Sequence, residues 1–255
     1  MKKKPLVSIV TPCYNSSDFI ADTIICVQKQ SYECWEMLIT DDGSSDSTVE
    51  IIEEFMAKDQ RIKLFKIPNS GAAVARNNSI EASQGTYVAF LDSDDLWHPK
   101  KLEKQISFMI DNHYAFTFTA YQQMNQKGIL LRNKIAADER LTYRELLFSN
   151  KIGCLTAVYN QEELGKIYMP LIRKRQDYGF WLSILKKIDF AYGLDEVLAM
   201  YRIRNFSVSS KKIEMLKWNW KLFREIENKN RITTLFLLLS NVFFKLKNNQ
   251  LPQNK

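Results

Sequence analysis

A cluster of acidic residues stands at the end of an apolar stretch in the first half of the chain. The segment YVAFLDSDDLWHP (87–99) runs from apolar residues into Asp92, Ser93, Asp94 and Asp95. Carboxylates that are brought together repel one another, and leaving them desolvated and unpaired is costly. The segment therefore predicts a positive partner. Strand periodicity places Asp92 and Asp94 on one face.

The elements that must position this cluster follow from the alternation of apolar runs. Four strands are expected at 6–11, 35–40, 62–67 and 86–92, and four helices at 18–30, 46–57, 72–83 and 99–112. Near-continuous apolar strands that alternate with helices predict a parallel sheet covered on both faces. The fold class is therefore α/β with a Rossmann-like, mostly parallel sheet.

The second half of the chain has a weaker pattern. It predicts strands at 114–124 and 153–159, a helix at 177–187 and one or two strands within 190–203, whereas 125–150 is ambiguous. From residue 211 onward the pattern is helical.

Polar clusters follow three of the predicted strands. They are Thr11–Asn15, the pair Asp41 and Asp42 with the residues after it, and Asp92–Asp95. In sheets of this kind, ligands bind beyond the carboxyl ends of the strands. The alternative is that these residues only cap the following helices, but caps rarely need adjacent aspartates. We therefore expect one binding site at this edge of the sheet.

The sequence lacks the glycine-rich loops that hold a diphosphate in several nucleotide-binding proteins. The segment TPCYNSSDF (11–19) has no glycine, and the chain has no GxxxxGK[ST] motif. A diphosphate is therefore not held by a glycine cradle. The alternative is a divalent cation on carboxylates, and oxygen-only ligands favour Mg²⁺ or Mn²⁺. The sequence thus predicts a nucleotide diphosphate with a metal ion at Asp92–Asp95.

Charge and composition exclude several classes of protein. Residues 211–255 hold ten Lys/Arg and three Asp/Glu, so they carry the whole net charge of +7 and residues 1–210 balance to zero. This argues against a nucleic-acid-binding face on the main body. Two histidines make a zinc site or a Ser-His-Asp triad improbable. Without a signal-peptide pattern, we expect free thiols and a cytoplasmic location.

Four motifs in order resemble those of the family 2 glycosyltransferases, which have the GT-A fold. They are VSIVTPCYN, MLITDDGSSDST, NSGAAVARNNSI and AFLDSDDLW, and the resemblance covers residues 5–110 closely. The segments RKRQDYGFWLSILKK and YRIRNFSVSSKK are most similar to bacterial enzymes of surface-polysaccharide and teichuronic-acid type synthesis. The resemblance implies an inverting, metal-dependent transferase that uses a nucleotide-sugar donor, expected to be UDP-linked.

The resemblance also implies roles for individual residues. Asp92 and Asp94 form the D-x-D of the metal site, with Asp94 in direct contact and Ser93 beside the nucleotide. The nucleotide would be bordered by Pro12, Tyr14, Asn15, Asp41, Asp42 and Arg76, with Asp42 accepting from the base and Arg76 against the base or diphosphate. Three alternatives stay open: the two aspartates only start a turn, Arg76 is a solvated helix residue, and Tyr14 packs in the core.

The general base is expected at Asp177. The family places an acidic pair before an aromatic residue, and here the matching RQDYGFW has Gln176 in the first position and Asp177 in the second. The alternative is that Asp177 is a helix N-cap, a position that aspartate suits. Arg202 and Arg204 would close over the diphosphate or be ordinary surface charges, and a histidine common there is missing.

The expected organisation is a GT-A domain at 1–210 with a basic helical tail at 211–255. The first part divides into a nucleotide-binding half (1–112) and an acceptor half (113–210). The run 232–244 is too short to span a bilayer, which needs about 20 apolar residues. Its stripe consists of Leu235, Leu238, Leu239, Val242, Phe243 and Leu246. This stripe would contact an anionic membrane surface, the body of the protein or a dimer partner.

These observations predict transfer of a sugar to a glycan or a lipid-diphosphate-linked saccharide, in cell-surface polysaccharide synthesis. The expected location is the cytoplasm. A narrower expectation is that the protein attaches peripherally to the inner face of the cytoplasmic membrane. Two alternatives are a sugar-nucleotide nucleotidyltransferase and a non-catalytic membrane-associated subunit with the same fold. The first needs a Gly-rich loop that TPCYNSSDF lacks, and the intact Asp92, Asp94 and Asp177 argue against the second.

Overall fold

The computed structural model describes residues 4–203 and 212–250, apart from the side chains of 212, 213 and 244–250. Arg204 and the side chain of Leu246, both singled out above, lie outside this description.

The first half of the chain alternates strands and helices as expected. Its elements are β1 (Val7–Cys13), α1 (Ile20–Gln28), β2 (Trp35–Asp41), α2 (Thr48–Met56), β3 (Ile62–Lys66), α3 (Ala72–Ala82), β4 (Tyr87–Phe90), the short β5 (Leu96–Trp97) and α4 (Lys101–Asn112). All eight elements predicted for this half are confirmed, with boundaries shifted by a few residues.

The second half contains the segments that the sequence left ambiguous. Its elements are β6 (Phe116–Met124), β7 (Leu130–Ile135), β8 (Arg140–Leu141), α5 (Tyr143–Phe148), a 3₁₀ turn (Cys154–Thr156), β9 (Val158–Asn160), α6 (Gln161–Leu164), α7 (Gln176–Ile184) and β10 (Ala191–Arg202). The strand predicted at 153–159 is wrong over its first part, because the 3₁₀ turn precedes the short β9. The tail forms α8 (Lys212–Lys221), a π-helical turn (Leu222–Ile226) and α9 (Arg231–Gln250).

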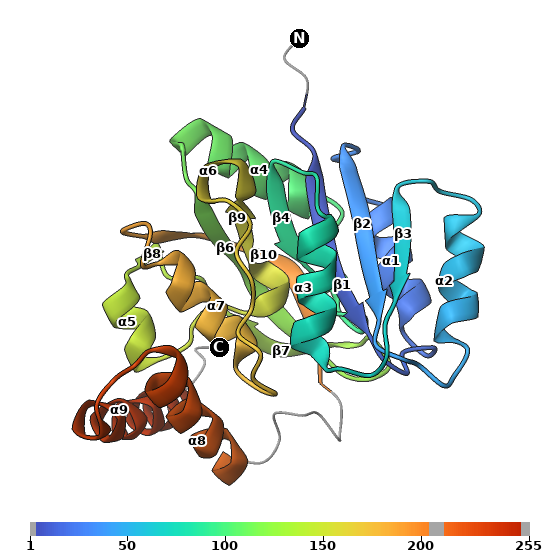
Figure 1. The fold of residues 1–255 in the computed structure, drawn as a ribbon. Helices are drawn as coiled ribbons and strands as arrows, with labels where there is room; N and C mark the ends of the chain where they lie inside the picture. The colour runs from blue at the N-terminus through green and yellow to red at the C-terminus, as the bar shows by residue number, and fades with distance from the viewer. Residues whose placement is uncertain (1–3, 204–211, 251–255) are drawn as a thin grey trace.

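The strands form one mixed sheet in the order β3-β2-β1-β4-β9-β6-β10-β5 (Figure 1). β1 runs parallel to both β2 and β4, β2 parallel to β3, and β10 parallel to β6. β9 is antiparallel to its neighbours β4 and β6, so β4, β6 and β10 share one direction. The carboxyl ends of β1, β2, β4 and β10 therefore lie at one edge of the sheet.

Two hydrophobic cores cover the two faces of this sheet. One contains Ile24 of α1, Ile52 of α2 and Ile106 of α4. The other contains Ile80 of α3 and Trp181 of α7. The alternation along β1 explains the arrangement, because Ile9 belongs to the first core and Val10 to the second. Burial on both faces is the reason why the strand is apolar almost without interruption.

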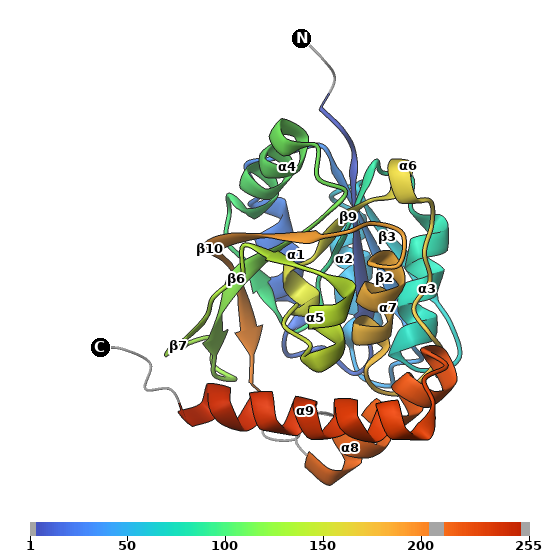
Figure 2. The ribbon, with the colours of Figure 1, turned by 90° about the vertical axis from the view of Figure 1, so that its left-hand side faces the viewer.

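The C-terminal helices pack onto the second half of the domain. Leu222, Phe223 and Leu237 belong to the same core as α5 and α7, and each is at most 3% exposed. Figures 1 and 2 show α8 and α9 at the end of the molecule toward which β1 runs. The segment expected as an extension thus completes the core through one face of α9.

The two faces of α9 give a stability prediction with a matched control. Leu237→Ala should lower the free energy of unfolding by about 2–5 kcal/mol, because it leaves a cavity beneath α9. Leu239→Ala should change it by about 0.5 kcal/mol or less, since Leu239 is 62% exposed. Urea unfolding followed by circular dichroism measures both. Equal effects would mean that α9 does not pack as described.

Candidate active site

The acidic residues after β4 lie in a tight turn. β4 ends at Phe90, and the backbone N–H of Asp95 donates to the carbonyl of Asp92 at 3.1 Å. The expectation that strand periodicity places Asp92 and Asp94 on one face is therefore wrong. A turn, rather than an extended strand, gathers these carboxylates at the edge of the sheet.

Hydroxyl groups of the β1–α1 region hold this turn. The Oγ atoms of Ser16 and Ser93 are hydrogen-bonded at 2.8 Å, and both side chains are buried. The Oγ1 of Thr23 lies 3.0 Å from the carbonyl oxygens of both Ser93 and Asp95. The contacts cross 70 to 77 residues of sequence, and no local pattern marks Ser16 or Thr23 as their source.

Arg202 fastens the same turn from the end of β10. Its backbone N–H donates to Asp95 Oδ1 at 2.8 Å, and its Nε donates to the carbonyl of Asp94 at 2.7 Å. Its Nη1 donates to the carbonyl of Gln126 at 2.8 Å. The residue is 4% exposed, so the alternative of an ordinary surface charge is wrong. Its guanidinium bonds backbone oxygens and thereby shapes the acidic turn.

Arg76 of α3 is the cation that faces the cluster. Its Nη2 lies 2.5 Å from Asp92 Oδ1, and its side chain is 9% exposed. The alternative of a solvated helix residue is therefore wrong. Burial by itself lowers the pKa of Arg76, but the charges of Asp92 and Asp177 and the hydrogen bond to Asp92 raise it above the ordinary value. The protein itself thus supplies part of the positive charge that the acidic turn was predicted to need.

Asp41 and Asp42 have different local partners. Asp41 Oδ2 accepts from the backbone N–H groups of Gly43 and Ser44 at 3.1 and 3.0 Å, so this residue does shape the turn after β2. Asp42 accepts from the N–H groups of Ser70 and Gly71 at 2.6 and 2.9 Å, where α3 begins. Asp42 therefore fixes the start of the helix that carries Arg76.

The residues after β1 line the same edge. Tyr14 is 50% exposed, so the alternative of core packing is wrong. Asn15 has a left-handed backbone (φ 46°), and its Oδ1 accepts from Ser45 N–H at 2.9 Å, next to the Asp41 turn. Pro12 is buried within β1 opposite Thr40. An exposed aromatic ring beside polar turns suits the stacking of a planar base.

Asp177 lies in the first turn of α7. The residue that precedes the helix is Arg175, in a left-handed conformation (φ 68°), so Asp177 is not the N-cap. The negative charge of Asp177 raises the pKa of Arg76 and of the Cys154 thiol, whose pKa burial also raises. Arg76 pairs directly with Asp92, and Asp177 lies close enough to act on Arg76 electrostatically. Sequence reasoning missed Cys154, which the 3₁₀ turn places among them.

The residues of the acidic turn fit a divalent cation. Asp95 Oδ2 is buried and has no hydrogen-bond partner within the described part of the chain. The Asp92 side chain is 29% exposed despite its ion pair. No three His, Cys, Asp or Glu side chains converge as a metal cage within residues 4–203 and 212–250. Mg²⁺-type ions are bound by one or two carboxylates together with substrate phosphates, and this turn offers such carboxylates.

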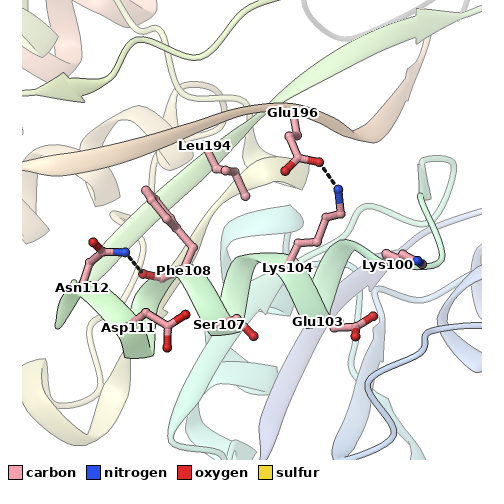
Figure 3. A pocket seen from close by; sticks show the side chains of 9 residues that line it. All are labelled: Lys100, Glu103, Lys104, Ser107, Phe108, Asp111, Asn112, Leu194 and Glu196. Carbon is pink, nitrogen blue, oxygen red and sulfur yellow. Dashed lines mark hydrogen bonds and ion pairs between the residues drawn. The ribbon is translucent and has the colours of Figure 1, made fainter.

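A hollow elsewhere on the surface has no comparable chemistry. It lies between α4 and β10, where Lys104 and Glu196 pair and Asn112 donates to the carbonyl of Phe108 (Figure 3). Its charges are of both signs, and it contains none of the site residues predicted above. The polar edge of the sheet therefore remains the candidate active site.

Solved structures confirm the expected GT-A fold. TarS of S. aureus in complex with UDP-GlcNAc superposes with a TM-score of 0.71 at 20% identity, covering 91% of this chain and 70% of TarS. The mannosyltransferase PcManGT of Pyrobaculum calidifontis, solved with GDP-Man and Mn²⁺, gives 0.68 at 15% identity, covering 94% and 69%. At these identities the likeness shows the fold alone.

Curated proteins show the family. The putative teichuronic acid biosynthesis glycosyltransferase TuaG of Bacillus subtilis is 51% identical over 88% of this chain and 89% of its own length. The UDP-Glc:alpha-D-GlcNAc-diphosphoundecaprenol beta-1,3-glucosyltransferase WfgD of Escherichia coli is 38% identical over 95% and 94%. The model of "Glycosyl transferase family 2" matches residues 8–162. The family match, the similarity along almost the whole chain and the acidic edge of the sheet agree, and the chain belongs to glycosyl transferase family 2.

Proposed function

We propose that the protein transfers a sugar, with inversion, from a UDP-linked donor to a saccharide carried on a lipid diphosphate. The observation that carries this proposal is the meeting of Asp92, Arg76 and Asp177 at the carboxyl edge of the sheet. The names of two relatives support the substrates, since WfgD and WfaP are UDP-Glc:alpha-D-GlcNAc-diphosphoundecaprenol glucosyltransferases. Glucose is therefore the first donor sugar to test.

Asp177 is the general base in this proposal. Its carboxylate takes the proton from an acceptor hydroxyl as that oxygen forms a bond to the anomeric carbon. The bond from the anomeric carbon to the nucleoside diphosphate breaks on the opposite face, which inverts the configuration. Asp177 suits this role because it is half-buried beside Arg76 and is not used as an N-cap.

Asp94 and Asp92 are the proposed ligands of a Mg²⁺ or Mn²⁺ ion. Such an ion supplies positive charge that neutralises the diphosphate of the donor and leaving group. Arg76 adds a fixed cation at the same edge, and the anchors at Ser16, Thr23 and Arg202 keep the turn in place. The protein thus supplies only part of the metal's ligands, and the donor diphosphate would supply others.

The nucleoside would lie on the β1 and β2 side of this edge. Tyr14 offers an exposed ring for the base, with Pro12 and Asn15 beside it. Asp42 remains the proposed acceptor for a ring N–H, because a carboxylate oxygen can accept more than one hydrogen bond. Asp41 and Ser93 would help to bind the nucleotide indirectly, by holding the turns after β2 and β4. Arg204 is a proposed contact of the diphosphate.

A peripheral contact with the membrane would bring the enzyme to a lipid-linked acceptor. The outward face of α9 carries Ile232, Leu235, Leu239 and Phe243, which are 54% to 84% exposed. The body-facing side contains Thr234 and Leu237 instead. The tail also carries all of the net positive charge. An apolar helix face with basic surroundings suits an anionic lipid surface.

This contact would not be a transmembrane anchor. Within the described residues, no helix combines the length and the apolar character needed to cross a bilayer. The proposed location is therefore the cytoplasmic membrane face, with α9 lying in the interface. The end of the molecule at which α8 and α9 lie is also the end toward which β1 runs, so the site would face the same surface (Figure 2).

The base is tested by Asp177→Asn, which keeps the shape and removes the charge. Transfer from UDP-glucose to a GlcNAc-diphospholipid should fall by ~10²-fold or more, while UDP binding persists. The control is Asp189→Asn, an exposed carboxylate beyond the other end of α7. A single-turnover assay measures the rate. Transfer at nearly the wild-type rate would place the base elsewhere.

The metal site is tested by Asp94→Asn. Calorimetry should show that Mn²⁺ no longer strengthens UDP binding, because the carboxylate that completes the site with the diphosphate is lost. Asp111→Asn, on the exposed side of α4, should behave like the unmodified protein. Unchanged Mn²⁺-dependent affinity in Asp94→Asn would exclude this residue as a ligand.

The membrane contact is tested by a double change of α9, Ile232→Ser with Leu239→Ser. Co-sedimentation with phosphatidylglycerol vesicles should drop several-fold, because the side chains are 84% and 62% exposed and leave the core untouched. The matched control is Ile129→Ser with Leu130→Ser, at 60% and 54% exposure near β7. Equal pelleting of both double variants would refute a membrane role of α9.

A further inference from the structure

Helix α3 contacts both halves of the candidate site through neighbouring residues. Arg76 pairs with Asp92 on the turn after β4. Asn77, the next residue, donates to the carbonyl of Met169 at 2.9 Å and accepts from its N–H at 2.7 Å. Met169 lies in the segment that leads into α7. The same helix therefore touches the acidic turn and the approach to the proposed base.

Gln176 completes this connection at the start of α7. With its amide oriented to satisfy both neighbours, its oxygen accepts from Arg76 Nη1 at 3.3 Å, and its nitrogen donates to the carbonyl of Arg173 at 3.2 Å. Gln176 is 8% exposed, and Asp177 follows it directly. One guanidinium thus bonds Asp92 through one nitrogen and Gln176 through the other.

The hydrogen bond between Arg76 and Gln176 restrains the start of α7. Arg175 adopts a left-handed conformation (φ 68°), which is unfavourable for a non-glycine residue and must be held by its surroundings. The helix begins immediately afterwards, and its first turn is held on one side by Tyr178, whose hydroxyl donates to the carbonyls of Leu146 and Leu147 at 2.6 and 2.9 Å. The contact between Arg76 and Gln176 adds a restraint on the side of the acidic turn, because Arg76 is itself fixed by burial and by Asp92.

The neutral amide also suits the local charges. Arg76 is a buried guanidinium that faces Asp92, and the charge of Asp177 acts on it as well. An amide at 176 gives Arg76 an acceptor without a third negative charge. Asp177 can then keep its carboxylate for the acceptor hydroxyl, because Gln176 takes the hydrogen bond from Arg76.

We propose that Gln176 is a positioning residue, which sets the Asp177 carboxylate relative to the Asp92 turn through its hydrogen bond to Arg76. This inference rests on the proposed role of Asp177 as general base. Gln176 itself does not touch the reacting atoms. Its loss should therefore affect the rate of the chemical step and leave the binding of the donor unchanged.

The variant Gln176→Leu keeps the volume and removes the acceptor. We expect kcat for transfer to fall about tenfold, with the KM for UDP-glucose and the Kd for UDP within about twofold of the unmodified values. Gln176→Glu should restore most of kcat, because a carboxylate oxygen can accept from Arg76. The control is Gln105→Leu, a buried glutamine on α4 that bonds Thr117 and the carbonyl of Thr156. It should lower stability without lowering kcat.

A double-mutant cycle separates this inference from the proposed function. Without the Asp177 carboxylate there is nothing left to position, so Gln176→Leu should not lower the residual rate of Asp177→Asn further. A tenfold loss in both backgrounds would overturn the positioning role, as would an unchanged kcat in Gln176→Leu or a loss confined to KM. If Asp177→Asn alone retained the normal rate, the base assignment would fail instead.

Discussion

The ion pair between Arg76 and Asp92 is the contact on which the site depends. The turn after β4 gathers Asp92, Asp94 and Asp95 within four residues, and their mutual repulsion has to be compensated. Burial and the charges of Asp94 and Asp92 raise the pKa of Asp95 well above its ordinary value, so the cluster resists ionising completely. A buried guanidinium at 2.5 Å from Asp92 offsets part of this charge. The part that remains suits a cation that arrives with a diphosphate.

Contacts from several other elements fix the positions of Arg76 and Asp92 relative to each other. Asp42 binds the backbone at the start of α3 and so sets the position of Arg76. Thr23 from α1 and Arg202 from β10 hold the acidic turn from two further directions. These contacts require that β1, β2, β4 and β10 end at the same edge, which the parallel pairing of the sheet provides. Rigid elements, rather than loops alone, therefore present the acidic residues.

The sequence predicted the elements of the first half because their signals are local. Strand and helix periodicity and the polar residues after each strand can all be read within about ten positions. The contacts that build the site are not local: Arg202 meets Asp95 across 107 residues, and Ser16 meets Ser93 across 77. No pattern in one sequence reports such pairs, so the hydrogen bonds from Arg202 to the acidic turn were not predicted. The 3₁₀ turn that carries Cys154 was missed because its apolar run resembles a short strand. In α9 the helical pattern was clear, but only the packing of Leu237 shows which face meets the body.

The central claim is that the Asp92–Asp95 turn receives the metal and the donor diphosphate, with Asp177 on the other side of the transferred sugar. Anomalous diffraction from a crystal containing Mn²⁺ and UDP-glucose tests it most directly. The account predicts an anomalous peak about 2 Å from a carboxylate oxygen of Asp94, as expected for a directly bound small divalent ion. It also predicts that the glucose lies between that peak and Asp177. A peak away from the turn, such as in the hollow along α4, or a sugar turned away from Asp177, would contradict it.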